Sequence, residues 1–176
     1  MPGNNINGIP YVDPRARTVS QRAWAPISSL FAYKPFAAVW RRFGAPLDPA
    51  IMKATGGRVR LSQGAPVLVL TSTGARSGQQ RETALAYFTD SDDVIVMASN
   101  YGGARHPNWY YNLLAHPECE LHIGRRGGRF VAREAEGADR DRLFALATNL
   151  LVASRKYAQR TDGVRTIPML RLTPSG

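Results

Sequence analysis

A short polar run near the middle of the chain carries groups that suit an anion. It joins two apolar stretches and reads Thr73-Gly74-Ala75-Arg76-Ser77-Gly78-Gln79-Gln80-Arg81. Its two close glycines permit a tight turn with positive φ angles, and the turn offers backbone N–H groups, a serine hydroxyl and two arginine forks. Arginine binds phosphate and carboxylate groups through paired hydrogen bonds. Two interpretations stay open at this point, an anion-binding nest and an ordinary hairpin turn.

A second segment combines aromatic surface with a carboxamide, and reads Pro107-Asn108-Trp109-Tyr110-Tyr111-Asn112-Leu113. Proline fits the first turn of a helix, and the helical period then places Trp109, Asn112, Leu113 and His116 on one face. A planar heterocycle with imide-like edges could use both the ring and the carboxamide. The alternative is a core helix, in which a buried Asn112 needs hydrogen-bond partners.

The remaining reactive residue types favour chemistry carried by a cofactor. Tyr157 could donate a proton to a reduced substrate, although the sequence alone favours a packed surface tyrosine. The three histidines lack metal-ligand spacing, so no metal site is predicted. Cys119 is the only cysteine, and its place in an expected strand indicates a packed thiol. Without an evident nucleophile or acid–base set, the protein would position a cofactor.

The chain has 176 residues and a formal net charge of +10, from 23 basic and 13 acidic side chains. This charge suits an anionic partner, although heavy arginine use can also reflect genomic base composition. The arginines are scattered and no nucleic-acid motif occurs, so nucleic acid is not expected as a partner. No stretch approaches the roughly 20 apolar residues of a spanning helix, and the first ten residues lack a secretory signal. We therefore expect a cytoplasmic protein, with contact to the inner face of the membrane left open.

The pattern of apolar residues and turn signals predicts an α+β fold with an antiparallel sheet or barrel. Strands are expected over 58–61, 66–73, 81–88, 93–99, 118–124, 128–136 and 166–172, and helices over 107–116, 138–151 and 154–160. Before this domain, which spans 45–176, we expect a disordered arm over 1–16 and an aromatic amphipathic helical extension over 17–44. The extension could rest on a membrane, shield a lipophilic substrate, or pack on its own domain or a dimer mate.

From about Gly56 to Pro174 the chain resembles the deazaflavin-dependent nitroreductase family of split β-barrel oxidoreductases, which is related in fold to FMN-binding proteins. The shared motifs occur in the same order and spacing; they are Thr73 to Arg81, the Ala98-Ser99 strand end with its glycine loop, Pro107 to Leu113, Ala115-His116-Pro117 and Arg165-Thr166-Ile167-Pro168. The resemblance implies a split β-barrel of about six or seven mainly antiparallel strands with peripheral helices. It also implies an enzyme that uses reduced coenzyme F420 as hydride donor to a hydrophobic, electron-poor acceptor such as a quinone, an enone or a nitroaromatic.

The resemblance further implies where the coenzyme would bind. The phosphate and acidic tail would lie near Ala75, Arg76, Ser77, Gly78 and Arg81. The ring would run along Thr83, Ala84, Leu85, Ala86, Met97, Ala98, Ser99 and Asn100, against Asn108, Trp109, Tyr110, Tyr111 and Asn112. Leu151, Ser154 and Tyr157 would shape the acceptor pocket, with Tyr157 as substrate contact or proton donor.

The chain departs from the family pattern at several of these positions. Ala75 and Arg76 stand where the family usually has Arg-Lys, and Asn100 stands where some relatives have Lys. Leu151 and Ser154 replace tyrosines of nitroreducing relatives, and Gly163-Val164 is inserted before the last strand. Two alternative functions stay open, an oxidoreductase of the same fold that prefers FMN, and a non-catalytic protein that binds anionic ligands or a membrane surface. Both a monomer and a homodimer are compatible with the sequence.

Overall fold

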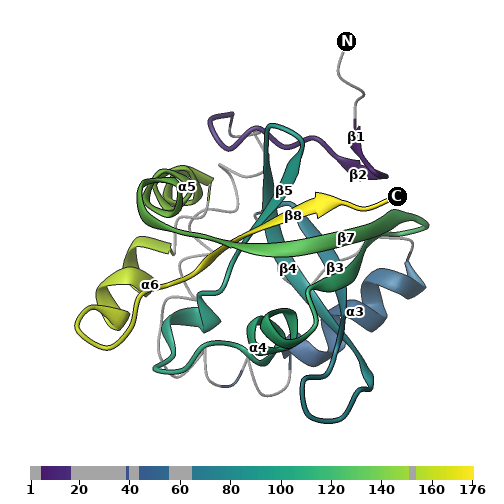
Figure 1. Ribbon diagram of the computed structural model, residues 1–176, viewed down its shortest axis with the longest axis horizontal. Coiled ribbons are helices and arrows are strands. Elements are labelled where there is room, and N and C mark those ends of the chain that lie inside the picture. Colours follow the sequence, from purple (N-terminus) through teal and green to yellow (C-terminus); the bar gives the residue numbers. More distant parts are fainter. Residues whose placement is uncertain (1–4, 17–38, 40–43, 56–64, 151–153) are drawn as a thin grey trace.

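The structure is a computed structural model that describes residues 5–16, 39, 44–55, 65–150 and 154–176. Six antiparallel strands of this part close into a barrel in the order β3-β4-β5-β8-β7-β6, which confirms the expected α+β split barrel (Figure 1). Their bounds are β3 Val67–Thr73, β4 Gln80–Asp90, β5 Asp93–Met97, β6 Glu118–Ile123, β7 Arg126–Ala135 and β8 Met169–Pro174. The helices are α3 Ala45–Ala54, η3 Asn100–Gly102, α4 Asn108–Ala115, α5 Gly137–Leu150 and α6 Ser154–Thr161.

The strands alternate between the barrel interior and the outer layers, as the two-residue period of a strand requires. In β5, Val94 and Val96 belong to the interior cluster, whereas Ile95 packs outside with Leu143 and Ala147 of α5. In β3 both faces are covered, because Leu68 and Leu70 point inward while Val67 and Val69 pack against Met52 of α3. The continuous apolar run of β3 therefore reflects burial on both sides.

The register gives the barrel two different ends. We call one the loop end; it carries the β3–β4 loop, the segment after β5 and helix α4. We call the other the hairpin end; it carries the β4–β5 and β6–β7 turns. Figure 1 shows α4 below the barrel and the β1–β2 hairpin above it. The ligand contacts that were expected from the sequence lie at the loop end.

Residues 5–16 differ from the expected disordered arm. Strands β1 (Asn5–Ile6) and β2 (Ile9–Pro10) form a hairpin whose Asn7-Gly8 turn has positive φ at both residues, the geometry this dipeptide favours. Ile6 and Ile9 are buried in the interior cluster. The Pro10 carbonyl accepts a hydrogen bond from the Tyr87 hydroxyl, at 3.1 Å. Burial of two isoleucines and bonds to β4 offset the loss of chain entropy, so this segment covers the hairpin end.

Several expectations lie outside the described residues. They are the strand over 58–61, residues 1–4 of the arm and nearly all of the extension over 17–44. No helix in the described part of the chain is long and apolar enough to cross a membrane. Helix α3 was not expected, because Pro46 and Pro49 within it weaken the helical signal.

Candidate functional site

The β3–β4 loop is a tight turn that depends on its two glycines. Gly74 N–H donates to the Gln79 carbonyl and Gly78 N–H donates to the Gly74 carbonyl, both at 2.8 Å. A β-carbon at Gly74 would lie 2.7 Å from Ser77 Oγ and 3.1 Å from the Gln79 carbonyl oxygen, so a larger residue would require both groups to shift. Gly78 has a φ of +64°, and a β-carbon there would meet open space. The turn is thus closed at its base and open toward solvent at its tip.

Two exposed arginines flank this open tip. Arg76 and Arg81 both lie on the surface, and Arg81 Nη2 donates to Gln79 Oε1 at 3.0 Å. Neither guanidinium forms an ion pair with a carboxylate of the described residues. Their positive charge is therefore available for an anion, as the nest interpretation requires.

Asn112 of α4 holds this loop against the barrel. Its Oδ1 accepts a hydrogen bond from Ala75 N–H at 3.0 Å, and its Nδ2 donates to Ser72 Oγ at 3.2 Å. Asn112 is buried, and these two bonds supply the partners that a buried carboxamide needs. The side chain and the Ala75 amide thus bind each other, where the sequence had suggested contacts to a ligand.

The other members of the α4 face are divided between core and surface. Trp109 and Leu113 are buried in the interior cluster, which agrees with the core-helix alternative, whereas His116 follows the helix and is exposed. Tyr110 is also buried, and its hydroxyl donates to Glu134 Oε2 at 2.7 Å. Burial and this bond raise the pKa of Tyr110 to about 12.

Only two of the five expected contact residues of α4 are exposed. Asn108 and Tyr111 point to solvent, and both belong to the expected contact set. Because Trp109 is buried in the core, the aromatic surface that α4 offers to a ligand is the exposed ring of Tyr111.

Strand β4 is paired on only one side over its first half. Residues Gln80 to Ala86 pair with β3, whereas pairing with β5 runs only from Tyr87 to Asp90. The side chains of residues 83–86 are half-buried. In the described part of the chain, no strand pairs with the other edge of residues 80–86. This edge therefore stays unpaired beside the end of β5. This is the split in the barrel, and the expected ring contacts of β4 lie along it.

The chain leaves β5 in an uncommon backbone conformation. Asn100, Tyr101 and Gly102 follow one another with φ angles of 47°, 54° and 73°. The left-handed region costs roughly 1–2 kcal/mol for a residue such as tyrosine. Asn100 Nδ2 donates to the Arg105 carbonyl at 2.8 Å, which closes the turn. Because such strain persists only where the surroundings impose it, contacts elsewhere must hold this segment.

Arg165 supplies those contacts. Its guanidinium donates to the carbonyls of Ala98 (3.3 Å), Ser99 (2.8 Å) and Gly103 (3.0 Å). It also lies 3.0 Å from His106 Nδ1. Since an arginine only donates, His106 Nδ1 is the acceptor and the proton of the neutral ring is on Nε2.

The cluster around Arg165 is partly withdrawn from water. Burial, and then the charge of Arg165, lower the pKa of His106. Burial also lowers the pKa of Arg165 itself. The sequence contained Arg165 within a shared motif but gave no signal for its role or for His106, because their partners are backbone carbonyls distant in the chain.

Two of the three residues expected to shape the acceptor pocket are described, and both are buried. Tyr157 is only 7% exposed and meets Tyr101 edge-on, with ring centroids 6.3 Å apart. Burial raises the pKa of the Tyr157 phenol. Ser154 is buried as well, and Leu151 lies outside the described residues. This packing agrees with the alternative of a structural Tyr157.

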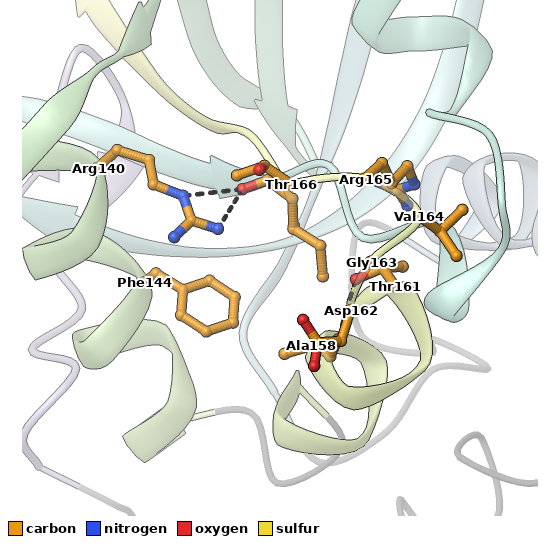
Figure 2. Close-up of a pocket in the computed structure, with 10 residues that line it drawn as sticks. Arg140, Phe144, Ala158, Thr161, Asp162, Gly163, Val164, Arg165 and Thr166 are labelled. Atoms are coloured by element: carbon orange, nitrogen blue, oxygen red, sulfur yellow. Dashed lines mark hydrogen bonds between the residues drawn. The ribbon is translucent and has the colours of Figure 1, made fainter.

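A cavity of about 480 Å³ lies beside α6, between α5 and the segment that enters β8. Figure 2 shows Arg140 and Phe144 of α5 facing Ala158 and Asp162 across it. Arg140 Nε and Nη2 both donate to the Ile167 carbonyl. The inserted pair Gly163-Val164 and Arg165 complete its wall, and none of the expected ligand contacts lines it.

Cys119 is a packed thiol of β6. It is buried, and burial raises its pKa to about 12, which suppresses the thiolate that a nucleophile needs. Across the described ranges, no group of three or more His, Cys, Asp or Glu side chains is placed to hold a metal ion.

Comparison with known proteins identifies the relatives of this barrel. The sequence model of the family described as F420H(2)-dependent quinone reductase matches residues 47–174, which include every strand of the barrel. The chain belongs to this family. The F420H(2)-dependent quinone reductase of Mycobacterium tuberculosis is 36% identical over 132 residues, covering 72% of this chain and 87% of that protein. The resemblance inferred from the motifs is confirmed.

Two solved structures agree with this assignment. One, described as an F420-H2 dependent reductase, is 31% identical with a TM-score of 0.55, covering 61% of this chain and 93% of that one. The second, described as a domain-swapped dimer, has the same identity and TM-score and covers 61% of this chain and 79% of that one. A relative with this barrel can therefore assemble as a dimer.

Proposed function

We propose that this protein is an oxidoreductase that binds reduced coenzyme F420 at the loop end of the barrel and reduces a quinone-type acceptor. The observation that carries this proposal is the family match, which spans the whole barrel and includes the Gly74–Arg81 loop, the end of β5 and α4. The names of the relatives give both the hydride donor and the acceptor class.

The residues present fit an anionic coenzyme. The tip of the β3–β4 loop is open at Gly78 and carries two arginines without a carboxylate partner in the described part. Arg76, Ser77 and Arg81 would hold the phosphate and acidic tail through charged hydrogen bonds. Ala75 would contribute less, because its N–H already donates to Asn112. The phosphate would thus be held mainly by side chains.

The half-paired stretch of β4 and the end of β5 would hold the ring. Thr83 to Ala86 and Met97 to Asn100 border the split, and Asn108 and Tyr111 add the exposed part of α4. Bound there, reduced F420 would supply a hydride. The task of the protein is then orientation, since positioning accounts for much of the rate in such reactions.

Fluorescence titration with F420 tests the proposal directly. Saturable binding at micromolar concentration, followed by oxidation of F420H2 when a soluble naphthoquinone is added, is the expected result. Comparing a naphthoquinone with an enone and a nitroaromatic ranks the acceptors. Absence of binding while a family relative binds in the same assay would contradict the proposal. A protein that purifies yellow with flavin absorbance would favour FMN instead.

A further inference from the structure

Arg165 connects two parts of the molecule that are far apart in sequence. It stands just before β8, yet its four hydrogen bonds reach the segment between β5 and α4. Within the described residues it forms no ion pair. Four of the five N–H donors of the guanidinium thus bond to backbone carbonyls and a histidine ring.

The geometry of the fork matches what this segment requires. The Ala98 and Ser99 carbonyls lie before the left-handed residues Asn100 to Gly102, and the Gly103 carbonyl lies directly after them. Donors on Nε, Nη1 and Nη2 therefore hold both sides of the strained turn at once. A lysine ammonium is one point charge and cannot span these acceptors in a plane.

Helix α6 makes a second contact with the same segment. A β-carbon at Gly102 would lie 3.0 Å from Arg160 Cδ and 3.3 Å from the Tyr157 backbone, so α6 packs directly on the turn. Arg160 Nη1 reaches the Tyr101 carbonyl at 3.5 Å. The turn is thus fixed between α6 and Arg165.

We propose that Arg165 is a positioning residue for coenzyme binding, which sets the backbone of residues 98–103 in the conformation that receives the ring. This inference rests on the proposed function, since residues 97–100 are its expected contacts. Arg165 acts through its hydrogen bonds to the carbonyls of Ala98, Ser99 and Gly103, and it need not touch the coenzyme.

Arg140 offers a matched control from the same cavity. Its guanidinium donates two hydrogen bonds to the Ile167 carbonyl, at 3.1 and 2.9 Å, and one to Asp141 Oδ1, at 2.8 Å. Both arginines line the cavity drawn in Figure 2, but Arg140 bonds to Ile167 and Asp141 instead of residues 98–106. Either substitution removes one charge and several hydrogen bonds, but only Arg165→Gln removes bonds to residues 98–106, and Arg140→Gln also removes an ion pair with Asp141.

The first measurement uses the protein without coenzyme. Amide hydrogen exchange of the peptide covering 97–106 should be faster in Arg165→Gln than in the wild type, and unchanged in Arg140→Gln. Equal exchange in Arg165→Gln and the wild type would overturn the proposal, whatever the coenzyme turns out to be.

The second measurement is the Kd for F420 by fluorescence. Arg165→Gln should raise Kd about tenfold, which corresponds to about 1.4 kcal/mol of binding free energy. Its KM for the quinone should stay near the wild-type value, whereas KM for F420H2 rises. Arg140→Gln should leave Kd unchanged. An equal rise in both variants would mean general destabilisation and would overturn the proposal.

Arg165→Lys separates geometry from charge and serves if Arg165→Gln does not fold. We expect the lysine variant to keep most of the increase in Kd, because it retains the charge but loses the fork. Full recovery of wild-type Kd would show a purely electrostatic role and would overturn the positioning role. A wild-type protein that binds no F420 would contradict the proposed function, and the exchange result would then still decide whether Arg165 holds the backbone of residues 98–103.

Discussion

Arg165 and Arg171 lie on the same C-terminal segment, yet their surroundings differ in kind. Arg171 donates to the carboxylates of Asp90, Asp93 and Asp139, at 2.8 to 3.0 Å, and is 8% exposed. Arg165 donates to carbonyls and a histidine. Carboxylates compensate the positive charge of Arg171, whereas no carboxylate of the described residues pairs with Arg165.

The direction of the pKa shifts follows this difference. Carboxylate hydrogen bonds raise the pKa of Arg171, whereas burial lowers the pKa of Arg165. The hairpin end thus contains compensated charge that fastens α5 and β8 to the β4–β5 turn, and the loop end keeps positive charge at Arg76, Arg81 and Arg165. The basic residues therefore have a different role at each end of the barrel.

The largest expected effect tests the compensated side of this comparison. Arg171→Ala should lower the free energy of unfolding by about 3 kcal/mol, because three carboxylates lose their shared partner. Urea denaturation measures the change. The Kd for F420 of the folded variant should equal that of the wild type.

Arg142 provides the control for that change. It pairs with Asp90 and Asp139 in the same cluster, but its side chain is 47% exposed, so Arg142→Ala should cost only about 1 kcal/mol. Hydrogen bonds from these arginines lower the pKa of both carboxyl groups. Their stabilisation is therefore present at neutral pH and is lost as the pH falls below the ordinary value of about 3.9. Equal losses in the two variants would refute the assignment of Arg171 as the centre of the cluster.

The next effect tests the uncompensated side. Arg81→Ala should weaken F420 binding by roughly 1–3 kcal/mol through loss of a charged hydrogen bond, with little change in the unfolding free energy, since Arg81 is exposed. Arg125→Ala at the β6–β7 turn removes the same charge from the hairpin end. If both variants bind equally weakly, net charge and not the loop carries the affinity.

Asn112→Ala should have a smaller effect, divided between stability and binding. It leaves Ala75 N–H and the Ser72 hydroxyl without their shared partner, which costs about 1–2 kcal/mol of unfolding free energy. The Kd for F420 should rise as well, because the loop that carries Arg76 is released. Leu114→Ala, an exposed change on the same helix, is the control. A stable variant with wild-type Kd would show that the loop needs no fastening.

The smallest effect concerns pH. The pKa of His106 is lowered in the folded protein, so the unfolded chain binds a proton first as the pH falls below about 6.5. The wild type should lose stability over this window by at most about 1.4 kcal/mol per pH unit. His106→Gln should flatten the profile there, as followed by urea denaturation between pH 7.5 and pH 5.5. Parallel profiles would mean that His106 is not held neutral by burial and Arg165.

Much of the barrel was predictable from local pattern. Six of the expected strands and all three expected helices occur near their expected bounds. The apolar periodicity and the turn residues that predict them depend only on residues close together in the sequence. The hairpin over 5–10 was missed, since a stretch rich in Asn, Gly and Pro becomes ordered only when Ile6 and Ile9 find the barrel interior. Helix α3 was not predicted, because the prolines within it weaken the helical pattern.

The order of the motifs, and with it the family, the cationic loop and the polar end of β5, follows from the amino-acid sequence alone. Which of those groups stay exposed to a ligand depends on the folded barrel. It committed Asn112 and Ala75 N–H to each other, buried Trp109 and Tyr157, and left Arg76 and Arg81 exposed. The physical reason is that a side chain's partners are set by burial and by contacts distant in sequence, as with Arg165 and the carbonyls of residues 98–103.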